Sequence, residues 1–197
     1  MDRADLFELL ERYEGRHSDE IVTIDRFRTL LDEHERCFFR DCFPGHITSS
    51  AWIVSRETRA VLLTNHRKLE RWLQLGGHTD GETDVLVSAL REAEEESGLR
   101  DFLPLPSADA CEILDLDVHQ IPARGEEPAH LHHDIRFLLE VSDAQPIRRQ
   151  ATESKEVRWF PADRVETHFD EESLLRMARK ATSWLAGSPV GPPDRQA

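Results

Sequence analysis

Three glutamates and one arginine near the middle of the chain have the residue types and the spacing of a divalent-metal site. Glu92, Glu95 and Glu96 stand at i, i+3 and i+4, so a helix would gather their carboxylates on one arc. Like charges placed so close oppose helix formation by roughly a few tenths of a kcal/mol per pair unless a cation joins them. All-oxygen ligation is what Mg²⁺ or Mn²⁺ prefers, and Arg91, one turn from Glu95, can hold that glutamate in place.

A glycine-rich segment precedes the glutamates and reads Gly76-Gly77-His78-Thr79-Asp80-Gly81-Glu82. Its first two glycines allow a tight loop with a carbonyl turned toward the same ion. Loop and carboxylates together predict a clamp for a phosphate-bearing substrate, in which metals neutralise phosphoryl oxygens and help to activate a water while a nearby free carboxylate accepts its proton. The alternative is a solvated acidic helix face, which explains neither the glycine loop nor the adjacent arginine.

At these residues the chain resembles the Nudix hydrolase family. The family's box reads Gly, five residues, Glu, seven residues, then Arg-Glu-apolar-any-Glu-Glu-any-Gly-apolar. Counted from Gly77, the second half of the box matches throughout, at Arg91, Glu92, Ala93, Glu95, Glu96, Gly98 and Leu99. The first half departs once, because Thr83 stands where the family has a glutamate and Glu82 lies one residue early. A loop shorter by one residue and a helix longer by one would absorb this shift.

The resemblance implies an α/β fold, namely an α/β/α sandwich with a mixed β-sheet. It also implies an enzyme that hydrolyses a nucleoside diphosphate linked to another moiety, with Mg²⁺ or Mn²⁺ as cofactor. By position, the metal ligands and catalytic carboxylates would be Glu92, Glu95 and Glu96, joined by the Gly76 carbonyl, and Arg91 would orient them.

Many members of the family take a further carboxylate, as base or as ligand, from a loop ahead of a later strand. In this chain the resemblance makes Glu153 the candidate catalytic residue and Glu156 the reserve. The alternative is that both glutamates only solvate a loop.

Other polar residues are candidates for substrate binding. His130, His132, Asp134 and Arg136 alternate along the chain, so on a strand they share one face that could bind phosphate, sugar or a transition metal. The alternative is an exposed polar face of a half-buried strand. His78, inside the box loop, could meet a phosphate.

Arg67 and Lys68 form one of the few basic spots before the box and could bind substrate phosphates through their charge. They could equally be ordinary surface cations.

The elements that must position these residues follow from hydrophobic periodicity. Helices are expected at 2–13, with Asp2 as cap, and after Ser18, with Asp19 and Glu20 in the first turn. Strands are expected at 47–54, 59–64, 111–118, 130–141 and 156–160, and further helices at 83–97, ending at Gly98, and at 171–185. This order predicts an N-terminal helical extension (1–43), a Nudix hydrolase domain (44–186) and a disordered tail rich in Pro and Gly (187–197).

Composition narrows the possible partners. The 197 residues include 39 acidic and 25 basic side chains, a formal net charge of −14, which disfavours binding to nucleic acid or to an anionic membrane. Three cysteines without a CxxC pair favour a reducing compartment, and no signal peptide or membrane span is expected. The sequence thus predicts a cytoplasmic protein whose partner is a small nucleotide-derived substrate, with a homodimer also open.

Two other classes of function stay open at this point. One is a Nudix-like binding or regulatory module that holds a nucleotide without cleaving it, an alternative favoured by the displaced Glu82 but not by the intact glutamate pair. The other is an unrelated α/β protein with an acidic helix. Metal-dependent phosphate release separates the first alternative from an enzyme, and divalent-metal titration separates the second.

Overall fold

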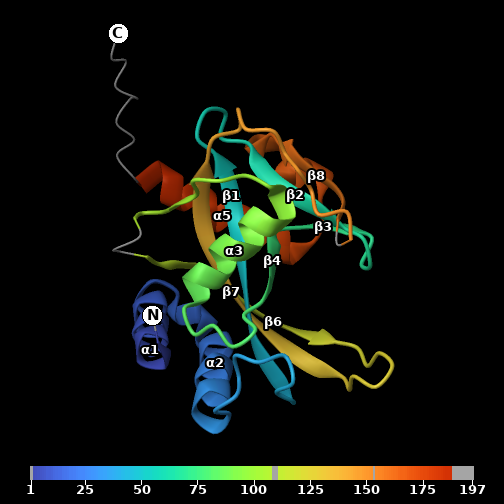
Figure 1. The fold of residues 1–197 in the computed structure, drawn as a ribbon. Helices are drawn as coiled ribbons and strands as arrows, with labels where there is room; N and C mark the ends of the chain where they lie inside the picture. The colour runs from blue at the N-terminus through green and yellow to red at the C-terminus, as the bar shows by residue number, and fades with distance from the viewer. Residues whose placement is uncertain (1, 108–110, 153, 188–197) are drawn as a thin grey trace.

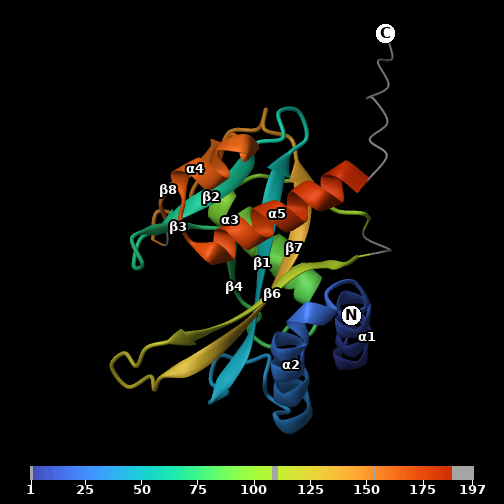
Figure 2. The ribbon, with the colours of Figure 1, turned by 180° about the vertical axis from the view of Figure 1, so that it is seen from behind.

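The computed structural model describes residues 2–107, 111–152 and 154–187 and contains helices on both faces of one mixed sheet (Figures 1 and 2). The helices are α1 (Arg3–Arg16), α2 (Ile21–Glu33), α3 (Val85–Ser97), α4 (Val165–His168) and α5 (Glu172–Gly187). The strands are β1 (Gly45–Ser55), β2 (Val61–His66), β3 (Arg71–Leu73), β4 (Leu75–His78), β5 (Leu103–Pro104), β6 (Ile113–Ile121), β7 (His130–Val141) and β8 (Ser154–Phe160).

The described residues form an eight-stranded sheet around a central parallel pair, β1 and β7. These two strands run side by side along their whole length, from Gly45 opposite Leu131 to Ser55 opposite Val141. On its other side β1 pairs first with β4 and then with β2, while β7 pairs with β6 and then with β5. All these other pairs are antiparallel, so the predicted mixed sheet is confirmed.

Alternation along β1 divides the core between the two faces. Ile47, Ala51 and Ile53 belong to a core shared with α1, α2 and α3, whereas Trp52 and Val54 pack with α5. Figure 1 shows α3 in front of the sheet, and Figure 2, which views the molecule from the other side, shows α5 crossing the opposite face. The predicted α/β/α arrangement with N-terminal helices is therefore confirmed.

Of the two N-terminal helices, α1 begins at a side-chain cap, whereas α2 follows a 3-10 turn without one. Asp2 accepts hydrogen bonds from the backbone N–H groups of Ala4 and Asp5, as its cap position predicted. The second helix starts later than expected, because Asp19 and Glu20 form a separate 3-10 turn, Ser18–Glu20, and α2 begins at Ile21. Both helices bury their apolar stripes in the core that also contains α3.

At the C-terminal side, α5 includes Gly187, so the predicted boundary of the tail at residue 187 is wrong by one residue. The rest of that predicted disordered tail, 188–197, lies outside the described residues. None of the helices in the described part of the chain combines the length and the apolar composition that crossing a bilayer requires.

Candidate active site

The helix that carries the glutamates starts at a side-chain cap. Asp84 has an extended backbone, and its carboxylate accepts a hydrogen bond from the N–H of Val87. Glu82 in turn accepts from the N–H of Asp84 at 2.8 Å. The expected start near Thr83 is therefore wrong by two residues: Thr83 lies in the loop and α3 begins at Val85. Gly98 ends the helix in the left-handed conformation, with φ 72°, as predicted.

Two of the three glutamates are buried against the glycines of β4. Glu96 accepts a hydrogen bond from the N–H of Gly76 at 3.2 Å. The Glu92 carboxylate lies over Gly77, where an added Cβ atom would come within 2.7 Å of Oε2. Glu92 and Glu96 are only 9% and 5% exposed, whereas the side chain of Glu95 is 52% exposed. The cluster thus has two inner carboxylates and one at the rim.

The glycine pair itself lies in a strand and not in the tight loop expected from the sequence. Gly76 and Gly77 belong to β4 and pair with Ser50 and Ser49 of β1. A Cβ at Gly76 would stand 2.2 Å from the Cβ of Ser50, so the close approach of the two strands requires glycine there. At Gly77 the absence of a side chain leaves room for the Glu92 carboxylate of α3.

Arg91 connects the glutamates to the end of β4. Its Nη1 donates to Glu92 at 2.7 Å and to Glu95 at 3.4 Å, and its Nη2 donates to the backbone carbonyl of His78 at 2.7 Å. The planar guanidinium thus holds three partners at once and joins the carboxylates of α3 to the end of β4.

The loop after β4 is fastened by the segment that follows α2. The Phe38 carbonyl accepts hydrogen bonds from the Thr79 hydroxyl at 2.7 Å and from the Gly81 N–H at 2.8 Å. Arg40 forms a two-point ion pair with Asp80, at 2.7 and 2.6 Å, and this hydrogen bonding lowers the pKa of the Asp80 carboxyl. The sequence does not predict these contacts. The two segments are about 40 residues apart, and no residue pattern in either one indicates that they pair.

The donor set suits a hard divalent cation. Carboxylate oxygens are the ligands that Mg²⁺ and Mn²⁺ accept, and Glu92, Glu95 and Glu96 supply them beside a strand whose backbone is bare of side chains at Gly76 and Gly77. Burying a carboxylate is costly unless positive charge lies nearby, and Arg91 places such a charge beside Glu92.

The further catalytic carboxylate expected from the sequence, Glu153, lies outside the described residues. The segment before it packs on the C-terminal end of α3, where the N–H of Arg148 donates to Ser97 O at 2.6 Å and that of Gln150 to Glu96 O at 3.2 Å. The reserve, Glu156, lies on β8 with a side chain 51% exposed, 3.6 Å from Arg158.

The three predicted basic contacts to substrate lie in different surroundings. Arg67 and Lys68 are exposed on the turn between β2 and β3, and Arg67 donates to the Ala151 carbonyl at 3.0 Å. Arg136 is 2% exposed, and its guanidinium lies within 3.2 Å of three carboxylates, those of Asp115, Asp117 and Asp134. Arg136 therefore forms part of a buried ion network, which Arg176 and Lys180 of α5 extend.

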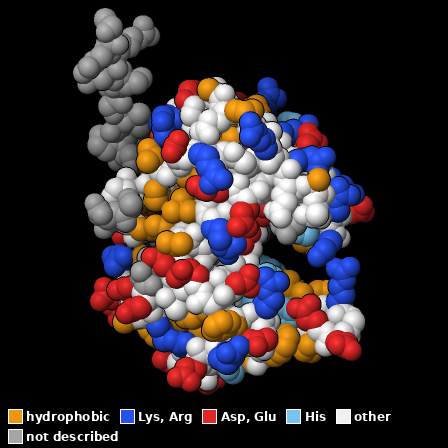
Figure 3. Space-filling model, in the orientation of Figure 1, with side chains coloured by type: hydrophobic (Ala, Val, Ile, Leu, Met, Phe, Trp, Pro, Cys, Tyr) orange, Lys and Arg blue, Asp and Glu red, His pale blue; other side chains and the backbone are white. Residues whose placement is uncertain are grey.

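His78, His130 and His132 come together, and they are joined by His46, which sequence reasoning missed. Ring centroids of His46 lie 5.1, 4.9 and 4.8 Å from those of His78, His130 and His132. Since His130 is 3% exposed, the alternative of an exposed polar strand face is wrong. The molecule is hollowed beside the β6–β7 hairpin, and histidine side chains are visible at the edge of the hollow (Figure 3).

Burial favours the neutral form of three of these histidines, His46, His78 and His132. Desolvation, together with the neighbouring cations and rings, lowers the pKa of His78 to about 4 and that of His132 to about 2, and desolvation also lowers the pKa of His46. Only the strand topology identifies His46 as a member of this group, because His46 and His132 are partners across the parallel β1–β7 pair.

Comparisons with known proteins relate this arrangement to one family. A family model described as the NUDIX domain matches residues 44–181. A CMP-5'-(N-acetyl-N-hydroxy-3-aminopropyl)phosphonate hydrolase of Streptomyces rubellomurinus is 31% identical over 139 residues, which make up 68% of this chain. The match covers 57% of that relative, so the chain spans little more than half of its length.

Solved structures share the fold. An Ap4A hydrolase of C. elegans superposes with a TM-score of 0.56 at 17% identity, over 72% of this chain and 98% of the other. A NUDIX-family hydrolase of Clostridium perfringens superposes with a TM-score of 0.52 at 25% identity, over 71% of this chain and 97% of the other.

Proposed function

The chain belongs to the Nudix family, and on that premise we propose that it is a metal-dependent hydrolase, one that cleaves the phosphoanhydride of a nucleoside diphosphate linked to another moiety. The products would be a nucleoside monophosphate and a second phosphate compound, formed by attack of an activated water. The observation that carries the proposal is the pair of buried carboxylates, Glu92 and Glu96, set against the two glycines of β4 beside the Arg91 guanidinium.

The carboxylates of Glu92, Glu95 and Glu96, with the Gly76 carbonyl, are the proposed holders of Mg²⁺ or Mn²⁺. When bound, such an ion supplies charge neutralisation for phosphoryl oxygens and a lowered pKa for a bound water. Arg91 is a positioning residue, because its fork joins two glutamates to the strand.

The base that accepts the proton of the attacking water is proposed to be Glu153, with Glu156 in reserve. The described backbone supports a role for this region, since residues 148 and 150 hydrogen-bond to the last turn of α3. Glu95, at the rim, is the carboxylate of the cluster that solvent reaches most easily.

Substrate phosphates are proposed to meet the cations Arg67 and Lys68 and the loop residue His78. Arg136 is left out of this set, because its donors already face Asp115, Asp117 and Asp134. The named substrates of the similar proteins, a CMP-linked phosphonate and Ap4A, support a nucleotide derivative as the substrate class.

The catalytic domain is proposed to span residues 44–186, with residues 1–43 as an extension that supports the loop after β4. Contacts from Phe38 and Arg40 to that loop favour this role for the extension. The three cysteines are buried free thiols, which supports the cytoplasm as the compartment; a homodimer stays a prediction.

The proposal is tested by incubating the full chain with a panel of nucleotide derivatives and with Mg²⁺ or Mn²⁺, and by identifying the products by mass spectrometry. Dinucleoside polyphosphates, nucleoside diphosphate sugars and CMP-linked phosphonates form the panel. We expect a nucleoside monophosphate in the presence of metal and none after chelation. Binding without release would instead support a nucleotide-binding module, and neither binding nor release would contradict both functions.

A further inference from the structure

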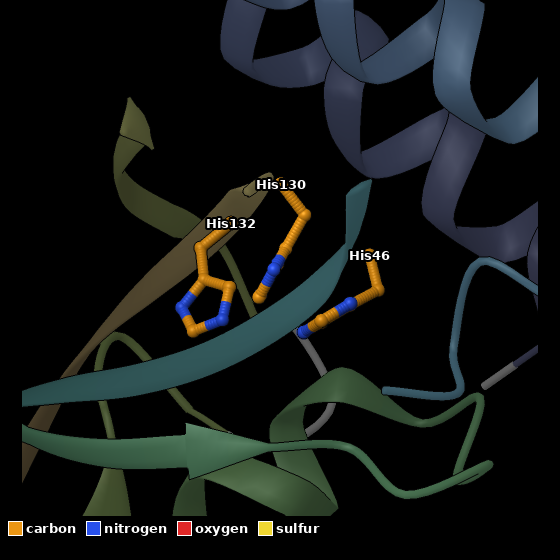
Figure 4. A group of neighbouring side chains, drawn as sticks. All are labelled: His46, His130 and His132. Carbon is orange, nitrogen blue, oxygen red and sulfur yellow. The ribbon is translucent and has the colours of Figure 1, made fainter. Parts of the chain in front are cut away.

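Three histidines converge on strands β1 and β7, whereas the glutamate cluster lies on helix α3. His46 is the second residue of β1, and His130 and His132 lie at the start of β7. Their ring centroids form a triangle with sides of 4.8, 4.9 and 5.3 Å. Figure 4 shows the three rings turned toward one another. The parallel pairing of β1 with β7 places His46 directly opposite His132, so the backbone fixes this convergence.

Hydrogen bonds to the backbone fix the tautomer of two of these rings. The Nδ1 of His46 lies 3.3 Å from the carbonyl oxygen of Cys42, and the Nδ1 of His130 lies 2.9 Å from that of Pro128. A carbonyl oxygen only accepts, so each Nδ1 carries the proton and donates it. Each Nε2 is then left as an unprotonated nitrogen with its lone pair free for a ligand bond.

Those two lone pairs are buried and unused. Within the part of the chain that the structure describes, neither His46 Nε2 nor His130 Nε2 has a hydrogen-bond partner, although the residues are 0% and 3% exposed. Buried polar atoms are rarely left unsatisfied, and each exception calls for a ligand or another explanation. Metal-bound histidines also typically donate their second ring N–H to a backbone carbonyl in this way.

We propose that His46, His130 and His132 bind a transition-metal ion of the Zn²⁺ type, at a site separate from the glutamate cluster. One ligand atom from each histidine lies within 4.8 Å of the other two. Tetrahedral Zn²⁺ with bonds of about 2.0–2.1 Å holds its nitrogen ligands about 3.3 Å apart, so small side-chain rotations close the site. Three imidazoles leave a fourth position for water, for a carboxylate or for an oxygen of a bound substrate.

The arrangement favours a cation over an anion. An anion needs N–H donors, whereas the inward Nε2 atoms of His46 and His130 are acceptors. The carboxylate of Glu127 lies 3.8 Å from His130 Nε2, where it attracts a cation and repels a phosphate. Imidazole nitrogen also prefers Zn²⁺ and similar ions to Mg²⁺, which distinguishes this site from the glutamates. We therefore assign His130 and His132, which the sequence proposed as substrate contacts, to metal ligation.

The site is tested by titrating the chelator-treated full chain with Co²⁺, whose visible absorption reports tetrahedral coordination. We expect one saturable equivalent, displaced by Zn²⁺ and not by excess Mg²⁺. His46→Gln and His132→Gln should each weaken Co²⁺ binding on the order of a hundredfold or more, since each removes a direct ligand. His132 is only partly buried, so its variant serves if the His46 variant does not fold, as judged by circular dichroism.

Two control variants separate this site from its neighbours. His133→Gln changes a histidine of the same strand that contacts Phe27 on the opposite face, and Glu96→Gln changes the glutamate cluster. Both variants should keep the Co²⁺ signal. Because Co²⁺ binding is measured without any hydrolysis, the histidine site can be judged even if the proposed hydrolase function is wrong. Absence of a saturable Co²⁺ site in the wild-type chain, or unchanged affinity in both ligand variants, overturns the proposal.

Discussion

Arg91 donates from Nη2 to the backbone carbonyl of His78 at 2.7 Å, so the guanidinium that holds the glutamates also holds the last residue of β4. The His78 ring lies 5.1 Å from both the His46 and the His132 ring. One side chain thus connects the carboxylate cluster of α3 to the strand that borders the histidine group. We therefore expect turnover to depend on the fork geometry of Arg91 more than on its charge.

Replacing Arg91 with lysine keeps the charge but removes the fork. Because Lys cannot reach Glu92, Glu95 and the His78 carbonyl together, we expect kcat of the Mg²⁺-dependent hydrolysis to fall on the order of 10²-fold, with a smaller change in KM. The control is Arg100→Lys, which alters an exposed ion pair with Glu94 at the end of the same helix. Equal activities of the Arg91 and Arg100 variants would show that the fork does not position the glutamates.

Gly77→Ala tests the contact between β4 and α3. The new Cβ would lie 2.7 Å from Glu92 Oε2, so the carboxylate must move and metal-dependent turnover should fall at least about tenfold. Steady-state kinetics and the Mg²⁺ concentration for half-maximal activity measure the effect. Gly15→Ala, in α1 with nothing within 4 Å of the new Cβ, is the matched control and should leave activity unchanged. Full activity of Gly77→Ala would contradict the placement of Glu92.

The helix of the candidate site could be predicted from the sequence, whereas its partners could not. The spacing of Glu92, Glu95 and Glu96 and the glycine at position 98 are local signals, and α3 follows them closely. Which glutamates face inward depends on where β4 lies, and that is set by strand pairing. Periodicity also predicted the strand that carries His130 and His132, but it contains no information on the residue opposite them.

His46 shows most clearly that local sequence patterns do not reveal which strands pair. It lies 86 positions before His132 in the chain, and only the parallel β1–β7 register brings the two together. Likewise, the predicted tight loop at Gly76-Gly77 became a strand, because β1 offers those residues a full set of backbone partners at a distance that only glycine allows.

The buried ion network between the sheet and α5 should contribute to stability. Arg176 forms two 2.8 Å contacts with Asp115, whose side chain is fully buried, and one of 2.9 Å with Asp117. Arg176→Met leaves these carboxylates with fewer donors and should lower the free energy of unfolding by about 1–3 kcal/mol. Urea unfolding measures it. Arg179→Met, which removes an exposed pair with Glu172 on the same helix, should change little; equal effects would argue against the network.

The same network predicts a pH dependence. Burial opposes ionisation of Asp115 and Asp117, but hydrogen bonds and nearby cations outweigh it, and the pKa of each carboxyl is lowered. A pKa lower in the folded state than in the unfolded state stabilises the fold above the unfolded value of about 3.9, and this stabilisation is lost as the pH falls further. The difference in unfolding free energy between wild type and Arg176→Met should therefore stay constant down to about pH 4 and narrow below it. A difference that widens in acid would have the wrong sign.

The most direct test of the central claim is the turnover of Glu96→Gln against wild type with Mg²⁺ and a substrate identified in the nucleotide panel. The substitution keeps the size of a side chain that accepts from the Gly76 N–H but removes the charge of an inner carboxylate. Glu94→Gln, on the same helix but paired with Arg100, is the control. We predict that kcat falls on the order of 10²–10³-fold in Glu96→Gln, with an unchanged unfolding transition, and stays at the wild-type level in Glu94→Gln. Wild-type turnover in a folded Glu96→Gln variant would contradict a catalytic site at this cluster.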